Sequence, residues 1–160
     1  MIGARSKGFS LIELVVVLVL LGLLTALVTP AFVRTFRRLE AKTTSKKISA
    51  ILRYCRSESV NKNRLYLASF DARANLLSVL YAPVGEESPT AERSYTLPID
   101  MKIEKVDVGK TLLDVSLPSF EFYPNGGSNG GTALVRRGQE EGYSIHVDFL
   151  TGSVRMEEAE

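Results

Sequence analysis

The chain of 160 residues has few of the residues on which many catalytic and covalent sites depend. It contains one cysteine, Cys55, and therefore forms no disulfide within itself, so that packing alone must hold its fold together. It also contains one histidine, His146. A zinc site or a cysteine–histidine nucleophile pair lacks ligands in such a sequence.

Ser144, His146 and Asp148 are the residue types of a hydrolase triad, but they alternate along a predicted strand. Alternate residues of a strand project side by side about 6.5 Å apart, which is too far for a relay of hydrogen bonds. We therefore interpret them as a polar face and expect no enzymatic activity and no cofactor. The opposite face of this strand is expected to pack on the core: Tyr143, Ile145, Val147 and Phe149.

Charged residues are absent from residues 14–33. A helix of about 20 apolar residues spans the hydrocarbon core of a bilayer, so this run predicts a transmembrane helix segment at residues 9–33. A buried helix of this kind would need a larger protein to cover it. A secretory signal is the other alternative, and it predicts a secreted β-domain that starts near Phe32. The run, however, exceeds the usual ~7 to 15 residues of a signal core and lacks an A-x-A-like cleavage site.

A short N-terminal motif carries the first resemblance to a known family. Residues 7–14 have the sequence Lys-Gly-Phe-Ser-Leu-Ile-Glu-Leu, in which a basic leader precedes a glycine, a phenylalanine and a lone carboxylate. This segment resembles the signal of type IV pilins and pseudopilins. The resemblance implies that residues 1–8 are a leader peptide, which a prepilin peptidase/methyltransferase removes between Gly8 and Phe9. It also implies that the same enzyme methylates the new amine of Phe9.

Glu13 is the residue that a membrane segment tolerates least, because a carboxylate at the bilayer centre costs roughly 2.5 to 3.5 kcal/mol. By the resemblance, Glu13 pairs with the N-terminal amine of a neighbouring subunit and so directs assembly. The alternative is an interfacial glutamate that extends its carboxylate toward the headgroups. Gly22 and Pro30, in the same segment, predict a helix kink, because proline removes one backbone hydrogen bond.

Residues 34–64 hold ten Lys or Arg and two Glu, and their apolar positions recur at spacings of three and four. This pattern predicts an amphipathic helix whose apolar face, including Ile48, Leu52 and Cys55, packs on the head. The basic face is open to three hypotheses: solvation, contact with lipid or neighbouring subunits, and nucleic-acid binding. We do not expect a nucleic-acid partner, because Phe36 and Tyr54 are the sole aromatic residues among these charges, fewer than a stacking platform would require.

Positive residues normally mark the cytoplasmic side of a membrane span, yet Arg34, Arg37 and Arg38 follow this one. The leader motif nevertheless leads us to expect a single-pass protein of the bacterial inner membrane with its head in the periplasm. In this interpretation residues 34–64 form a periplasmic helix.

From residue 65 onward, short apolar runs alternate with turn residues, which indicates a β-rich head over residues 65–160. The sequence thus predicts an α+β fold, in which one long N-terminal helix packs on a small antiparallel head. Turns are expected at residues 71–75 and 150–152, and an exposed loop at residues 82–92. The expected strands are residues 65–70, 76–81, 94–97, 101–108, 112–117, 120–123, 132–136, 143–149 and 153–156.

A second resemblance lies in the head. Residues 120–132 have the sequence Phe-Glu-Phe-Tyr-Pro-Asn-Gly-Gly-Ser-Asn-Gly-Gly-Thr, which is similar to the aromatic and glycine-rich stretch of H-type minor pseudopilins, the GspH/FimT group. Residues 53–64 and 145–155 resemble the same group. Because few charged residues lie in the loop that contains Gly126, Gly127, Gly130 and Gly131, we expect it to contact other subunits.

The resemblance implies a minor pseudopilin of a type II secretion pseudopilus. Such a subunit joins other major and minor pseudopilins in a hetero-oligomeric filament that drives exoprotein export from the periplasm. The alternative is a minor pilin of a type IV pilus or a DNA-uptake system, which shares every N-terminal feature. In both cases the protein acts by assembly.

Overall fold

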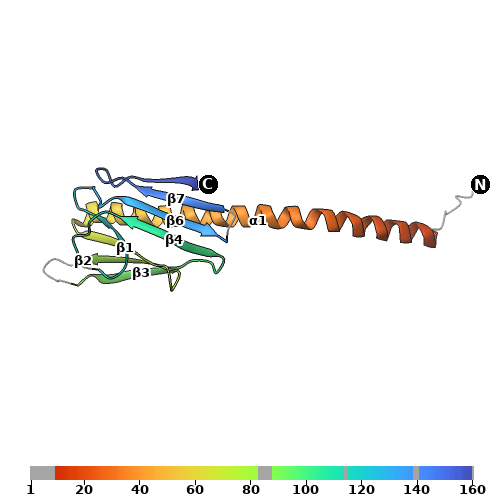
Figure 1. Ribbon diagram of the computed structural model, residues 1–160, viewed down its shortest axis with the longest axis horizontal. Coiled ribbons are helices and arrows are strands. Elements are labelled where there is room, and N and C mark those ends of the chain that lie inside the picture. Colours follow the sequence, from red (N-terminus) through yellow and green to blue (C-terminus); the bar gives the residue numbers. More distant parts are fainter. Residues whose placement is uncertain (1–9, 83–87, 114, 139–140, 160) are drawn as a thin grey trace, which may run out of the picture. The chain divides into compact units, whose positions relative to one another are not determined.

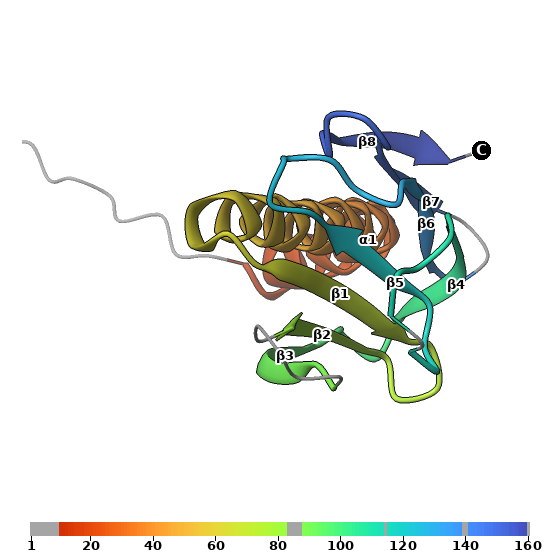
Figure 2. The ribbon, with the colours of Figure 1, turned by 90° about the vertical axis from the view of Figure 1, so that its left-hand side faces the viewer.

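The computed structural model describes residues 10–82, 88–113, 115–138 and 141–159, with the backbone alone for residues 26–38 and 141. The chain divides into two compact units, Met1–Arg38 and Leu39–Glu160. One helix, α1 (Leu11–Lys62), precedes the strands of the described chain; Figure 1 labels most of these elements, and Figure 2 labels β5 and β8. These strands are β1 (Leu65–Asp71), β2 (Leu76–Ala82), β3 (Thr90–Thr96), β4 (Met101–Val108), β5 (Ser119–Phe122), β6 (Gly131–Arg137), β7 (Glu141–Val147) and β8 (Val154–Ala159).

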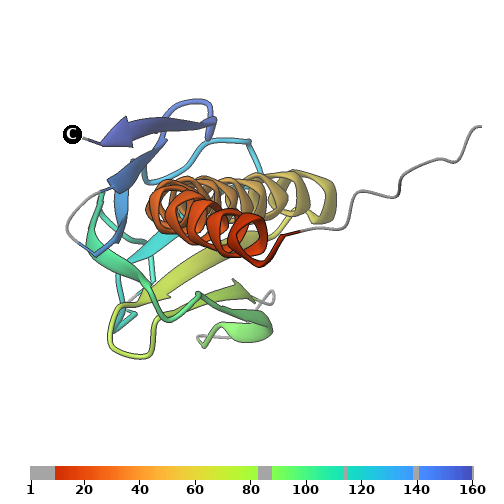
Figure 3. The ribbon, with the colours of Figure 1, turned by 90° about the vertical axis from the view of Figure 1, so that its right-hand side faces the viewer.

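The strands form two antiparallel sheets with four strands each. The first sheet has the order β3-β2-β1-β5, and the second has the order β4-β6-β7-β8. Within the second unit, the C-terminal half of α1 lies between the first sheet and the β8 edge of the second sheet, as the two end-on views show (Figures 2 and 3). This arrangement confirms the predicted fold class, a helix packed on an antiparallel head.

The C-terminal half of α1 is amphipathic, as predicted. Its buried residues recur every three or four positions, so they form one continuous stripe. These residues are Ala41, Thr44, Ser45, Ile48, Ser49, Ile51, Leu52, Cys55 and Ser59. They belong to a core that includes Phe70 and Phe120, whose rings meet edge to face with centroids 5.8 Å apart. Fully burying a Leu or Ile side chain stabilises the fold by roughly 1.5 to 3 kcal/mol, so this stripe is the main attachment of the helix to the sheets.

Cys55 is fully buried on this stripe, which confirms the prediction of a buried thiol. Burial disfavours the thiolate and raises the pKa of Cys55 to about 12. The nearby Glu92 carboxylate also contributes to this rise in pKa. The thiol therefore stays protonated and unreactive at neutral pH.

The helix ends at Lys62 because Asn63 adopts a left-handed backbone conformation, with φ of 49°. Asparagine tolerates this conformation better than most residues, and it commonly terminates a helix. The backbone N–H of Arg64 then donates to the carbonyl of Ser59 at 3.2 Å, which satisfies one of the last helical acceptors. The helix therefore ends at Lys62, within the segment predicted over residues 34–64.

Both predicted turns are present. In the first, the Asp71 carboxylate accepts the backbone N–H groups of Arg73 and Ala74, each at 2.9 Å. In the second, the Asp148 carboxylate accepts the backbone N–H of Thr151 at 2.8 Å. Carboxylates that bond the backbone two or three residues onward are a common device of tight turns.

Three expectations about the head were wrong. The described residues of the range 112–117 form no strand, because the backbone N–H groups of Leu112 and Leu113 donate to the Glu121 carboxylate instead of to a ladder. Residues 90–92 belong to β3 and not to a loop, while residues 83–87 lie outside the described chain. Phe149 was expected in the core but is 63% exposed, because β7 ends at Val147 and the chain turns there.

Candidate assembly sites

The cleavage site predicted between Gly8 and Phe9 lies outside the described residues, so cleavage and methylation stay predictions. The first described residue, Ser10, caps α1. Its side-chain oxygen accepts the backbone N–H of Glu13 at 3.3 Å, and its carbonyl accepts the N–H groups of Glu13 and Leu14. Ser followed three residues later by Glu is a common helix start.

Glu13 lies in the first turn of α1, where the positive end of the helix dipole favours a carboxylate. Its side chain is exposed, and within the described part of the chain its carboxylate forms no ion pair or hydrogen bond. An outside cation can therefore reach it. The predicted role of Glu13 in assembly stays a prediction.

The side chains of residues 11–24 are apolar except for Glu13 and Gly22, and they are exposed all around the helix. Their exposed fractions range from 43% for Val17 to 81% for Leu11. Within the described residues, no helix is both long and apolar enough to cross a membrane. The predicted membrane segment at residues 9–33 extends beyond them and stays a prediction.

The predicted kink sites, Gly22 and Pro30, both lie inside α1, which is one uninterrupted helix in the structure. Thr25, close to Gly22, bonds its hydroxyl to the carbonyls of Leu21 and Gly22 at 3.0 and 2.9 Å. A threonine hydroxyl bonded back to the preceding turn often bends a helix slightly. The kink itself stays a prediction.

The glycine-rich loop is largely an internal element of the head. Gly126, Gly127 and Gly130 are buried, and Gly131 is half-buried. Gly131 has φ of 137°, and a Cβ there would lie 2.2 Å from the backbone oxygen of Asp107. Only glycine satisfies both the conformation and the close approach. The loop's role in subunit contact stays a prediction, and its surface for such contact lies at the exposed residues Pro124 and Asn125.

This loop joins α1 to the β7–β8 turn. On one side, the Ser59 hydroxyl donates to the carbonyl of Tyr123 at 3.1 Å, and the Arg56 guanidinium donates to the carbonyl of Gly126 at 3.2 Å. On the other side, the Ser128 hydroxyl donates to the carbonyl of Asp148 at 2.8 Å. The glycines therefore couple the helix to the second sheet.

Glu121 is a fully buried carboxylate next to this loop, and the sequence analysis missed it. It accepts the backbone N–H groups of Leu112 and Leu113 at 2.8 and 3.1 Å and the hydroxyl of Tyr123 at 3.2 Å. Burial, followed by the Glu121 charge, raises the pKa of Tyr123 to about 12. A lone acid between Phe120 and Phe122 was the available signal, because a charge in a buried strand must find partners.

Asn129 fixes the position of β5 in the same network. Its side-chain oxygen accepts the backbone N–H of Glu121 at 2.9 Å, and its side-chain nitrogen donates to the carbonyl of Ser119 at 3.0 Å. An amide side chain thus takes the place of a neighbouring strand along the free edge of β5.

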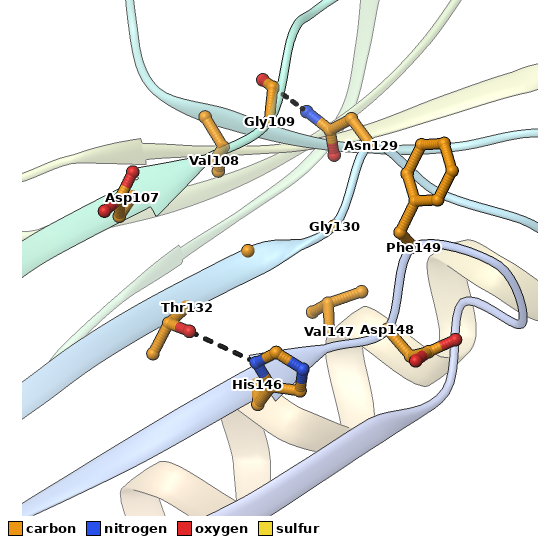
Figure 4. A pocket seen from close by; sticks show the side chains of 11 residues that line it. Asp107, Val108, Gly109, Asn129, Gly130, Thr132, His146, Val147, Asp148 and Phe149 are labelled. Carbon is orange, nitrogen blue, oxygen red and sulfur yellow. Dashed lines mark hydrogen bonds between the residues drawn. The ribbon is translucent and has the colours of Figure 1, made fainter.

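An open pocket of about 560 Å³ lies beside the loop, between the end of β4 and the β7–β8 turn (Figure 4). In this pocket, the hydroxyl oxygen of Thr132 lies 3.2 Å from Nδ1 of His146. Asp148 instead bonds the hydroxyl of Thr151 at 2.7 Å, and this bond lowers the pKa of Asp148. Two of the residues that resembled a triad, His146 and Asp148, therefore have separate partners.

Known proteins resemble this chain in its N-terminal motif and in its fold. Residues 3–29 match the prokaryotic N-terminal methylation motif, whereas curated proteins give no match to the chain. The minor pseudopilin EpsH from the type 2 secretion system of Vibrio cholerae has a similar fold, with a TM-score of 0.62 and 13% identity. The similarity covers 76% of this chain and 96% of EpsH. A second structure of EpsH gives a TM-score of 0.61 at 12% identity, over 74% of this chain and 97% of EpsH.

The type IV minor pilin FimU from Pseudomonas aeruginosa has a TM-score of 0.54 and 17% identity, over 75% of this chain and 90% of FimU. The motif and the fold together confirm the resemblance to pilin-like proteins. These structural neighbours are pilin and pseudopilin subunits, and at these identities they establish the fold alone.

Proposed function

We propose that the protein is a minor pseudopilin, a structural subunit of the type II secretion pseudopilus that assembles in the periplasm and drives exoprotein export. The observation that carries this proposal is the occurrence in one chain of the methylation motif at residues 3–29 and a head with the fold of EpsH. The motif alone indicates a processing route and the fold alone an architecture. Both features are expected together in subunits of pilus-like filaments.

The N-terminus would supply the assembly chemistry. Cleavage after Gly8 frees the amine of Phe9, and the Glu13 carboxylate lies four residues further along. Pairing of this carboxylate with the amine of a neighbouring subunit neutralises both charges, which removes the cost of placing either one in a membrane. The Glu13 carboxylate is exposed and has no partner among the described residues, which supports this role.

The attachment of α1 to the head supports a subunit that transmits force. Residues 39–62 of α1 share a hydrophobic core with both sheets, and Arg53 also donates to the carbonyl of Val154 in β8 at 2.9 Å. A force applied along this part of the helix is therefore transmitted to the whole head. A filament that moves folded proteins requires such a connection.

The alternative is a minor pilin of a type IV pilus or a DNA-uptake system, and the similarity to FimU supports it. A gel shift of the full chain with duplex DNA, repeated across salt concentrations, separates the two proposals. Tight binding that weakens steeply with salt favours a DNA-uptake pilin. Absence of binding is the result expected for the pseudopilin.

Intact mass and N-terminal sequencing test the shared pathway. The chain is recovered from membranes of cells with and without the prepilin peptidase. We expect mature chains that start at methylated Phe9 only when the peptidase is present. An uncut Met1 in both strains, or a start near Phe32, would overturn the proposal.

A further inference from the structure

The structure brings a row of cations and tyrosines together where α1 lies against β3. Lys47, Tyr54 and Lys62 are seven and eight residues apart, so they lie on the same side of α1. This side faces β3, because the Tyr54 hydroxyl donates to the Glu92 carboxylate at 2.8 Å and the Lys47 ammonium lies 5.7 Å from the ring centroid of Tyr95. We call this surface, with the adjoining ends of β1 and β2, the α1–β3 seam.

Four cations of the seam lie over tyrosine rings, each less than 6 Å from a ring centroid. The pairs are Lys47 over Tyr95 at 5.7 Å, Lys62 over Tyr66 at 5.8 Å, Arg64 over Tyr81 at 5.9 Å and Arg93 over Tyr54 at 5.9 Å. All four cationic residues are exposed. The rings hold these long side chains in place but leave their charges available, which reduces the entropy that a binding partner must offset.

A hollow lies toward each end of the seam. The first, of about 330 Å³, has mainly apolar walls that include Ile51, Leu77 and Leu97. The second, of about 450 Å³, is polar and lies between Lys62 and Arg64. Lys47 and Lys62 are fifteen helical residues apart, so the seam extends about 22 Å along α1.

Two acids of the seam are described, and each has a partner inside the head. Glu58 pairs with Lys62 at 2.6 Å, and one oxygen of Glu92 accepts the hydroxyl of Tyr54, whereas its other oxygen has no hydrogen-bond partner. Among the described residues, no carboxylate forms an ion pair with Lys47, Arg64 or Arg93, so their charges are available to an acidic partner. Tyrosines do accompany the charges of the seam, which by itself would be compatible with nucleic-acid binding. However, cations lie over these rings, whereas stacking of bases requires open ring faces.

We propose that the α1–β3 seam binds an acidic segment of a neighbouring pilin-like subunit. The carboxylates of that segment meet Arg64 and Arg93, and one of its apolar side chains enters the hollow beside Leu97. Charge complementarity selects the segment, and the apolar hollow sets its register. This inference rests on the proposed function and adds which side of the head another subunit covers.

Photocrosslinking of the full chain, in cells that assemble the filament, tests the seam. Benzoylphenylalanine replaces Thr96, an exposed residue in the wall of the apolar hollow, and replaces Lys102, exposed on β4, as the matched control site. We expect a crosslink from position 96, and not from position 102, to an acidic peptide of a different subunit that carries a prepilin-type motif.

The charge dependence is tested with R64E/R93E and with the milder R64Q/R93Q, and K102E serves as the matched control. We expect both double variants to lower the crosslink yield by at least about tenfold while K102E does not, because the loss of two steering charges weakens encounter. Resistance to proteolysis verifies that each variant is folded.

A crosslink to the same chain, to lipid or to nucleic acid, or an unchanged yield in the folded double variants, would overturn the proposal. If the mature chain starts at Phe9 and no crosslink forms, only the seam fails, whereas an uncut chain contradicts the proposed function itself.

Discussion

The two ends of α1 have the same secondary structure and opposite environments. Between Leu11 and Leu24 the apolar side chains are exposed on every side of the helix, whereas from Ala41 to Ser59 a narrow stripe is buried by two sheets. The second segment obtains its stability from tertiary packing, as most helices of globular proteins do. The first has no such packing among the described residues, which is the pattern of a surface that is covered by something outside the chain.

The largest expected effect concerns the first segment. Glu13→Gln keeps the size of the side chain but removes the charge that is proposed to pair with a neighbour's amine. We expect incorporation into filaments to fall by more than about tenfold, because the unpaired amine is then costly to bury. Sheared filaments probed with an antibody measure this. Cleavage at Gly8 and folding of the head should be unchanged, and normal incorporation would contradict the assigned role.

A matched pair of leucines compares the two segments directly. Leu52→Ala removes a fully buried side chain and should lower the free energy of unfolding of the head by about 2 to 5 kcal/mol. Leu18 is 61% exposed, so Leu18→Ala should change the free energy of unfolding by less than about 0.5 kcal/mol. Chemical denaturation of the full chain in detergent micelles measures both values. Equal losses would mean that the segments do not differ in packing.

Glu121→Ala tests the buried network of the head. The substitution leaves two backbone N–H groups and the Tyr123 hydroxyl without their acceptor, and each such loss costs about 1 to 3 kcal/mol. We expect a total loss of about 3 kcal/mol and faster hydrogen exchange at Leu112 and Leu113. Glu121→Gln retains one acceptor oxygen and should lose less. Unchanged exchange at these two amides would show that the link does not depend on Glu121.

Two glycines distinguish steric conflict from backbone strain. Gly131→Ala meets the backbone of Asp107, while Gly138, with φ of 56°, has open space around it. We expect Gly138→Ala to cost about 1 kcal/mol, from the left-handed conformation alone. Gly131→Ala should cost about 1 to 3 kcal/mol more. Thermal unfolding measures the difference, and similar midpoints would mean that the strand edge relaxes at no cost.

Alkaline pH should destabilise the head. The pKa values of Cys55 and Tyr123 are raised to about 12 from ordinary values of 9.0 and 10.0. A raised folded pKa means that the stabilisation is complete below the ordinary value and is lost as pH rises toward 12. We expect the thermal unfolding midpoint to decrease as the pH is raised from about 8.5 to about 11.5. The decrease should be smaller in Cys55→Ala. An equal fall in both proteins would remove Cys55 as a cause.

Most elements of the fold follow from patterns that act over a few residues. The stripe of Ile48, Leu52 and Cys55 predicted the buried helix face, and alternation with turn residues predicted most strands. One failure arose where a group outside the segment decided the local structure. Residues 112–117 look like a strand, but a carboxylate nine residues from Leu112 takes their backbone N–H groups.

The two candidate assembly sites also differ in whether they depend on contiguous residues or on contacts between distant ones. The motif around Gly8, Phe9 and Glu13 is a linear signal, and for that reason the sequence shows it completely. The α1–β3 seam is not linear, since its cations and tyrosines come from α1, the chain that follows it, β1, β2 and β3. Helical and strand periodicities state which face of an element is polar. They do not state which polar faces meet.

By itself, the sequence determined the helix, its apolar first segment, the N-terminal motif and the β-rich head, because each depends on side-chain periodicity or on contiguous residues. Only the tertiary structure decided the internal role of the glycine-rich loop, the partners of Glu121 and the tyrosine-supported cations beside β3. Those features depend on contacts between residues far apart in the chain, and such contacts form only when the two sheets close around the helix.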